Sequence, residues 1–119
     1  MTTPSVAEAL QVSPHALYHA VKALGTLPKV HVLILHWHMP DGKEKSQRYE
    51  YSVVRVTDGI TTIAVAALQL KKFAQKAPEP LTACLDHKGL TFTYPNGTMH
   101  LQALGKFEEM PVVDLRGCQ

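Results

Sequence analysis

The sequence predicts an α+β fold, with an N-terminal helix-turn-helix followed by an antiparallel β-rich body that carries one further helix. Apolar residues recur at helical spacing near the N-terminus, whereas short alternating runs separated by turn signals fill most of the remainder. We therefore divide the 119 residues into a head over residues 1–27 and a body over residues 28–119, with the further helix at about residues 62–75. We expect the two parts to form one compact unit.

The head is predicted to contain two short helices, over residues 4–12 and residues 14–24. Three apolar residues share one face of the first helix: Val6, Ala9 and Leu10. Ser13 is a preferred cap for the second helix, and Pro14 is favoured at a first helical position. The buried stripe of the second helix consists of Leu17, Val21 and Leu24. Gly25 then suits the residue just beyond a helix C-terminus.

The body begins with two strands that are predicted to form a hairpin. Residues 29–39 have apolar side chains on both faces, which favours a central strand of a sheet. A Pro-Asp-Gly turn signal follows at residues 40–42. Residues 47–57 are rich in Tyr and Val and make the second strand of the predicted antiparallel pair.

Residues 60–76 are ambiguous between strand and helix. Their first part, ITTIAV, is compatible with a strand, but the later part, AALQLKKFAQKA, has apolar residues on one face and lysines on the other. We favour a helix from about residue 62 to residue 75. Short strands at residues 81–85, 90–94 and 98–101 then form a predicted meander, and the residues after Glu109 show no clear pattern.

Composition sets limits on the function. Apolar residues make up 45% of the chain and the formal net charge is +2, which permits DNA binding but does not argue for it. Cys84 and Cys118 form no metal signature or disulfide framework, so we expect reduced thiols. The N-terminus has no signal-peptide pattern, and the longest apolar stretch is too short to span a bilayer. We therefore expect a soluble, cytoplasmic protein.

One motif points to a function. The run V-A-E-A-L-Q-V-S-P-H-A-L-Y-H-A-V-K-A-L-G, from Val6 to Gly25, resembles the helix-turn-helix of the lac-repressor family and of phage repressors. In that pattern a small residue, here Ala9, lies where the helices cross, and Val12 packs beneath the turn. Gln11 stands at a turn position where Gly is common. The resemblance covers this segment only.

The resemblance implies a small sequence-specific DNA-binding transcriptional regulator, from a phage or another mobile element. The second helix of the pair would enter the major groove. Its implied DNA-binding residues are Ser13, Pro14, His15, Ala16, Tyr18, His19 and Lys22. By position, His15 and His19 correspond to the base-contacting residues of the family, while Tyr18 and Lys22 are within reach of phosphate.

Two further expectations follow from this reading. The predicted hairpin carries Lys43, Lys45 and Arg48, which are candidate phosphate contacts if the hairpin lies beside the helix pair as a wing; an ordinary solvated turn is the alternative. A head with one weakly basic helix would bind DNA poorly alone, so we expect a homodimer, formed through the β-rich body and its open sheet edge.

A second hypothesis is a protein-binding inhibitor or accessory module of a mobile genetic element, for example an anti-defence protein, that uses the helix pair for protein contacts. The weak charge fits this hypothesis well. The pairs His15/His19 and His36/His38 have zinc-compatible spacing, but no carboxylate or cysteine accompanies them, so we expect no metal site. We also expect no enzyme and no cofactor, because the chain lacks a Gly-rich phosphate loop, a nucleophile elbow and an HExxH motif.

Overall fold

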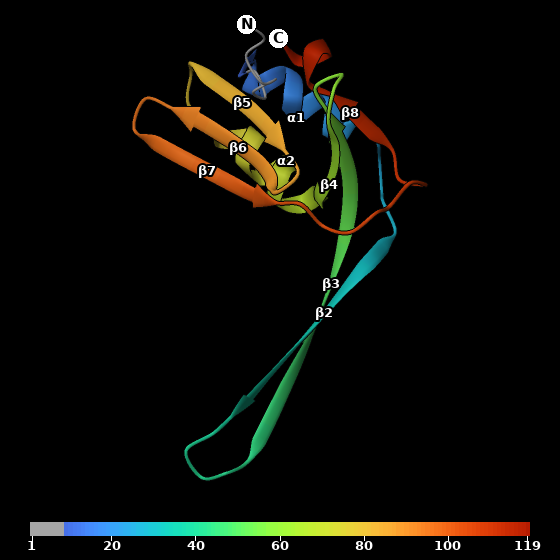
Figure 1. Ribbon diagram of the computed structural model, residues 1–119, viewed down its shortest axis with the longest axis vertical. Helices are drawn as coiled ribbons and strands as arrows, with labels where there is room; N and C mark the ends of the chain where they lie inside the picture. The colour runs from blue at the N-terminus through green and yellow to red at the C-terminus, as the bar shows by residue number, and fades with distance from the viewer. Residues whose placement is uncertain (1–8) are drawn as a thin grey trace, which may run out of the picture.

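A computed structural model describes residues 9–119. These residues form two β-sheets, in which most strand pairs are antiparallel, and two α-helices around one core (Figure 1). The first sheet has the strand order β1-β5-β6-β7. Its strands are Leu10–Val12 (β1), Leu81–Asp86 (β5), Gly89–Tyr94 (β6) and Gly97–Gln102 (β7). The second sheet has the order β2-β3-β4, with β8 paired in parallel to β3. Its strands are Lys29–His38 (β2), Glu44–Thr57 (β3), Thr62–Ala66 (β4) and Val112–Asp114 (β8).

Helices α1 (Pro14–Lys22) and α2 (Ala67–Lys76) pack against each other and link the two sheets into one hydrophobic core. In α1, Leu17 and Val21 are buried, and α2 buries Leu70 and Ala74. Helix α2 also packs on the first sheet through a tilted ring contact between Phe73 and Phe92, with centroids 4.7 Å apart. Neither described helix combines the length and hydropathy that crossing a bilayer requires.

The start of α1 follows from local chemistry, as the sequence predicted. The Ser13 hydroxyl accepts a hydrogen bond from Ala16 N at 3.2 Å, and Pro14 occupies the first turn, where its missing N–H is not needed. Beyond the helix, Gly25 has a φ of 71°, a left-handed conformation that glycine adopts without steric cost. The prediction of a capped helix from Pro14 is therefore confirmed.

The predicted N-terminal helix-turn-helix is wrong. Leu10–Val12 is a strand, not the end of a first helix, and it pairs antiparallel with β5 in the register Leu10↔Ala83 and Val12↔Leu81. Ala9, expected at a helix crossing, is exposed. The part of the predicted first helix over residues 4–8 lies outside the described residues.

A tertiary partner explains this departure. The open edge of β5 offers hydrogen-bonding groups to the backbone of residues 10–12, and the apolar side chains of Leu10 and Val12 then face the core while Gln11 faces solvent. The helix that α1 packs against is α2, which is separated from it in the chain by three strands. The α+β class holds only in this rearranged, β-rich form.

The segment after the second turn also differs from the expectation. Residues 62–66 form β4, and the helix predicted from about residue 62 begins only at Ala67. The β-branched residues Thr62, Ile63 and Val65 favour a strand, and β4 pairs with β3 over its whole length. The meander β5–β6–β7 is confirmed, with bounds within one residue of those predicted.

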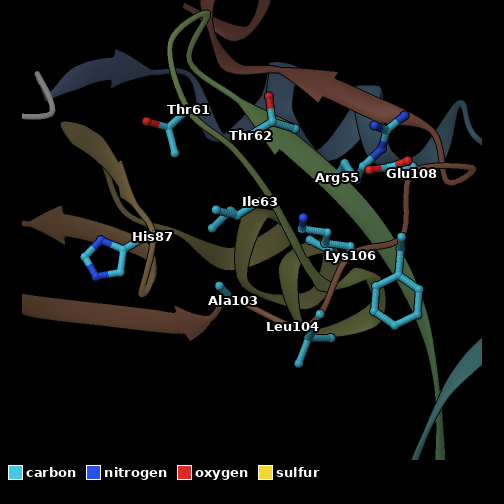
Figure 2. A pocket seen from close by; sticks show the side chains of 12 residues that line it. Arg55, Thr61, Thr62, Ile63, His87, Ala103, Leu104, Lys106 and Glu108 are labelled. Carbon is cyan, nitrogen blue, oxygen red and sulfur yellow. The ribbon is translucent and has the colours of Figure 1, made fainter.

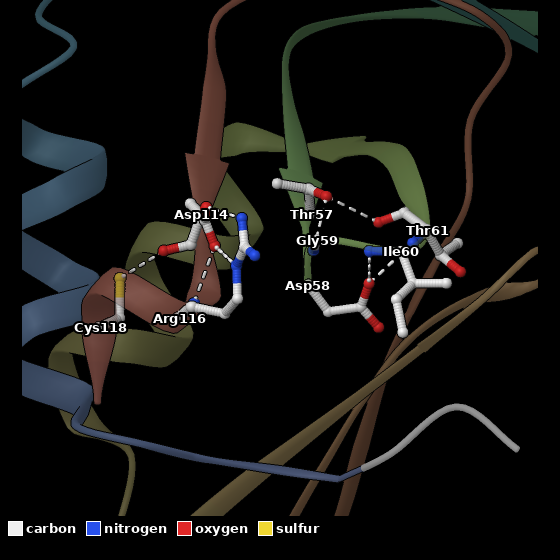
Figure 3. A network of polar contacts seen from close by, with 8 residues as sticks. All are labelled: Thr57, Asp58, Gly59, Ile60, Thr61, Asp114, Arg116 and Cys118. Atoms are coloured by element: carbon white, nitrogen blue, oxygen red, sulfur yellow. Dashed lines mark hydrogen bonds and ion pairs between the residues drawn. The ribbon is translucent and has the colours of Figure 1, made fainter. Parts of the chain in front are cut away.

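The C-terminal residues contact both the turn between β3 and β4 and the start of α1 (Figure 3). Strand β8 runs into a 3₁₀-helix, Leu115–Cys118, whose last carbonyl accepts a hydrogen bond from Ser13 N at 2.7 Å. Arg116 donates to Asp114 from Nε at 3.0 Å and from Nη2 at 2.7 Å, and these bonds lower the pKa of the Asp114 carboxyl. The Arg116 guanidinium lies against Gly59 in the β3–β4 turn, where φ is +94°. The tail without sequence pattern therefore joins the turn to the start of α1.

We predict that Leu17→Ala lowers the free energy of unfolding by about 2–5 kcal/mol, because Leu17 is fully buried between α1 and the core. His19→Ala on the exposed face of the same helix should change it by less than about 0.5 kcal/mol. Urea denaturation followed by circular dichroism measures both. Equal losses in the two variants would contradict the burial of this helix face.

Candidate protein-association surface

A two-stranded ribbon extends from the core of the protein. It consists of β2, the turn that follows it and the first part of β3, residues 29–52, and we call it the arm (Figure 1). The molecule is consequently elongated, with extents of 57 × 38 × 31 Å. At the end of the arm, Met39 N donates to Lys43 O at 2.8 Å and Gly42 N donates to Met39 O at 2.9 Å. Gly42 has a φ of 85°, as this tight turn requires.

The arm exposes most of the large apolar side chains that reach the surface of the described chain. Six of the nine lie on β2, each between 37% and 50% exposed: Val30, Val32, Leu33, Ile34, Leu35 and Trp37. The sequence correctly predicts that β2 is apolar on both faces, but it is wrong that β2 is a central strand. Within residues 9–119, β2 pairs with β3 alone and lies at the edge of its sheet.

The two faces of the arm differ in chemistry. On one face, Leu33 stands opposite Tyr49, and His31 opposite Tyr51, and the two tyrosine rings stack with centroids 6.4 Å apart. On the other face the β3 side chains are charged: Val32 stands opposite Glu50, and Ile34 opposite Arg48. Arg48 and Glu50 form an exposed ion pair at 2.9 Å. One face is therefore largely aromatic and aliphatic, and the other is mixed.

The hydrogen bond at the turn fixes which backbone groups of β2 point outward. Met39 is bonded to Lys43, and residues in an antiparallel pair alternate between bonding to the partner strand and pointing away from it. In the continuous register from His31 to His38, odd-numbered residues of β2 therefore bond to β3. The N–H and C=O groups of Val32, Ile34 and His36 point away from β3, along the outer edge of the sheet.

The arm has two such open edges, and they carry different side chains. Along the first part of β3, the sequence places charges of both signs that oppose pairing with another chain: Glu44, Lys45, Arg48 and Glu50. Between Val30 and Trp37, β2 has no Asp, Glu, Lys or Arg. Natural edge strands usually carry such charges, so the β2 edge is an unprotected site for strand pairing.

The aromatic face of the arm continues into a cleft at its base. The cleft has a volume of about 440 Å³ and lies between the arm and the end of β7. Its walls include His31, Leu33, Tyr51, Gln69, Leu101 and Leu104. The His31 ring also contacts Phe107 edge to face, with centroids 6.0 Å apart. Apolar surface therefore extends from the arm onto the core of the protein.

The residues that the resemblance implied for DNA binding separate into two groups. Ser13 caps α1, Pro14 is buried, and Ala16 is half-buried against the core. His15, His19 and Lys22 are exposed on the outer side of the helix, and Tyr18 is half-buried at its border with the core. The His15 and His19 rings lie 4.3 Å apart between centroids, and Lys22 Nζ lies 5.9 Å from the Tyr18 ring centroid. This outer side has one permanent positive charge.

The candidate phosphate contacts are not placed beside this helix. Lys43 lies in the turn of the arm, and Lys45 and Arg48 lie in the first part of β3. Figure 1 shows that the turn of the arm is at the opposite end of the molecule from α1. Arg48 is already paired with Glu50. Of the histidines on the arm, His36 Nδ1 lies 4.0 Å from a carboxylate oxygen of Glu44. Within residues 9–119 no three His, Cys, Asp or Glu side chains are grouped to hold a metal ion.

A second hollow, of about 450 Å³, lies beside β4 (Figure 2). Its walls bring together Arg55, His87, Lys106 and Glu108 with apolar residues such as Leu104. Arg55 Nε donates to Met110 O at 2.8 Å, which holds this side chain against the loop before β8. In Figure 2, the His87 side chain and the Thr61 and Thr62 side chains project from different segments that line the hollow.

No protein-family model, curated protein or solved structure matches this chain.

We predict that amide exchange along the arm of the dilute protein alternates with residue number. The amides of Leu33, Leu35 and Trp37 should exchange more slowly than those of Val32 and Ile34, because only the odd-numbered set is bonded to β3. Hydrogen exchange followed by NMR measures each amide. Uniform exchange rates along β2 would contradict the register of the arm.

Proposed function

We propose that this protein is a protein-association module that binds other polypeptide chains through the arm. The observation that carries the proposal is the row of six exposed apolar side chains on β2, along a strand edge without charged protection. The proposal agrees with the protein-binding hypothesis from the sequence, but the binding element is the arm and not a helix pair.

Energetic arguments support the proposal. The six side chains together expose on the order of 400 Å² of apolar surface. This surface is divided between the two faces of the strand, with Val32 and Ile34 on one face and Leu33, Leu35 and Trp37 on the other. Burying it on a partner would contribute about 25 cal/mol per Å² before the entropy of association is subtracted. An isolated two-stranded hairpin is also only marginally stable in water, so a partner would stabilise the arm itself.

The only tryptophan of the chain, Trp37, lies on this strand and reports directly on docking. We predict that the ¹⁹F signal of 5-fluorotryptophan at position 37 shifts and broadens when the protein is concentrated or added to extract of its host cell. In the variant Leu33→Thr/Leu35→Thr the signal should stay sharp, because threonine keeps the strand but removes the apolar contacts.

The matched control is Ile60→Thr/Leu68→Thr, which removes two exposed apolar side chains outside the arm, 82% and 55% exposed. This control should behave like the unchanged protein. A ¹⁹F signal that stays sharp in both conditions would refute the proposed function. A signal that broadens equally in the arm variant and the control would place docking elsewhere on the surface.

DNA binding by α1 is the second candidate, and the grouping of the His15, Tyr18, His19 and Lys22 side chains is the observation in its favour. It requires a mode of contact other than a helix-turn-helix, since β1 replaces the first helix. A single lysine on this side supplies little phosphate affinity, which makes it the weaker candidate.

If this candidate holds, Lys22→Ala should weaken binding to all DNA sequences and reduce the salt dependence by about one unit. His19→Ala should cost about 1–3 kcal/mol on a site selected from random sequence and leave other sites unaffected. Band-shift titrations at two salt concentrations measure both effects. Absence of salt-dependent binding to any selected DNA would remove the candidate.

A further inference from the structure

We infer that the partner of the arm is a second copy of this chain, joined edge to edge by antiparallel pairing of β2 with β2. The inference rests on the proposed function and names the polypeptide that the arm binds. Its basis is the contrast between the two open edges of one ribbon: β2 has no Asp, Glu, Lys or Arg between Val30 and Trp37, whereas the first part of β3 carries charges of both signs.

The β2 edge is complementary to itself. A two-fold axis normal to the ribbon makes the pairing antiparallel and brings the outward backbone groups of Val32, Ile34 and His36 opposite those of the second copy. With the axis at Ile34, Ile34 faces its own counterpart and Val32 faces His36 of the second copy. Three such pairs exchange about six main-chain hydrogen bonds.

The charges of the arm also favour this arrangement. Because no Lys, Arg, Asp or Glu lies between Val30 and Trp37, the seam brings no like charges of these types together. The charged side chains Glu44, Arg48 and Glu50 belong to β3, which becomes the outer strand on each side of a four-stranded ribbon. Pairing therefore covers the unprotected edge and leaves the protected edges in solvent, where they oppose the addition of further chains.

The surface available suits a dimer. Edge-to-edge pairing brings apolar side chains of the two copies side by side on both faces of the ribbon, so each face buries part of its exposed apolar surface along the seam. On the aromatic face the seam places Leu33 beside Leu35 of the second copy, since these positions pair when the axis lies at Ile34.

The test compares Ile34→Lys with Ser46→Lys in the full chain. Both positions are exposed and lie on the same face of the arm, but Ile34 is on the seam whereas Ser46 is on the outer strand. Sedimentation of the unchanged protein at micromolar concentration should show twice the chain mass. Ile34→Lys should raise the dimer dissociation constant by about 100-fold or more, through repulsion between the two lysines, while Ser46→Lys should change it less than about 3-fold.

Amide exchange provides the second readout. On concentrating the unchanged protein, the amides of Val32, Ile34 and His36 should gain protection, because their N–H groups are the ones that point to the seam. A dimer that survives Ile34→Lys, or that forms without protecting these amides, overturns the inference. A strictly monomeric protein whose fluorotryptophan signal still broadens in cell extract also overturns it, but leaves the proposed function standing.

Discussion

Strand β3 is the element on which the rest of the structure depends. Its last residues, Val53 to Thr57, pair with β4 on one side, and its final three also pair with β8 on the other. Val53, Val54 and Val56 are fully buried, so this half of the strand is fixed in the core. The first half of the same strand leaves the core and holds β2 along its length. The position of the arm therefore follows from the burial of three valines.

Because of this arrangement, the residues that form the core are different from those that form the exposed apolar surface of the arm. The core contains both helices, the meander and the C-terminal tail, and it needs no contribution from the outer part of β2. Apolar residues in that outer part lie outside the core and contact β3 within the arm. Natural edge strands usually carry charges, as β3 does on its own open side, and their absence between Val30 and Trp37 of β2 is the observation on which the proposed binding of a polypeptide rests.

Local residue patterns identified most helices and strands, but they did not identify which elements pack beside each other or which faces stay exposed. The cap at Ser13, the Pro-Asp-Gly turn and the alternation in β5, β6 and β7 depend on neighbouring residues, and the structure confirms each of them. For the candidate site, the apolar character of residues 29–39 was visible on both faces. Its exposure was not visible, because the same pattern is typical of a strand buried on both sides.

The sequence by itself determined the hairpin, its turn and the start of α1, because these depend on φ preferences, capping and side-chain alternation within a few residues. Only the tertiary structure decided that residues 10–12 add to the edge of β5, and that residues 62–66 pair with β3. Short apolar segments satisfy their backbone groups either within a helix or on a neighbouring strand, and a neighbour distant in the chain determines which. The same reason explains the open edge of β2, because the described part of the fold brings no strand other than β3 beside it.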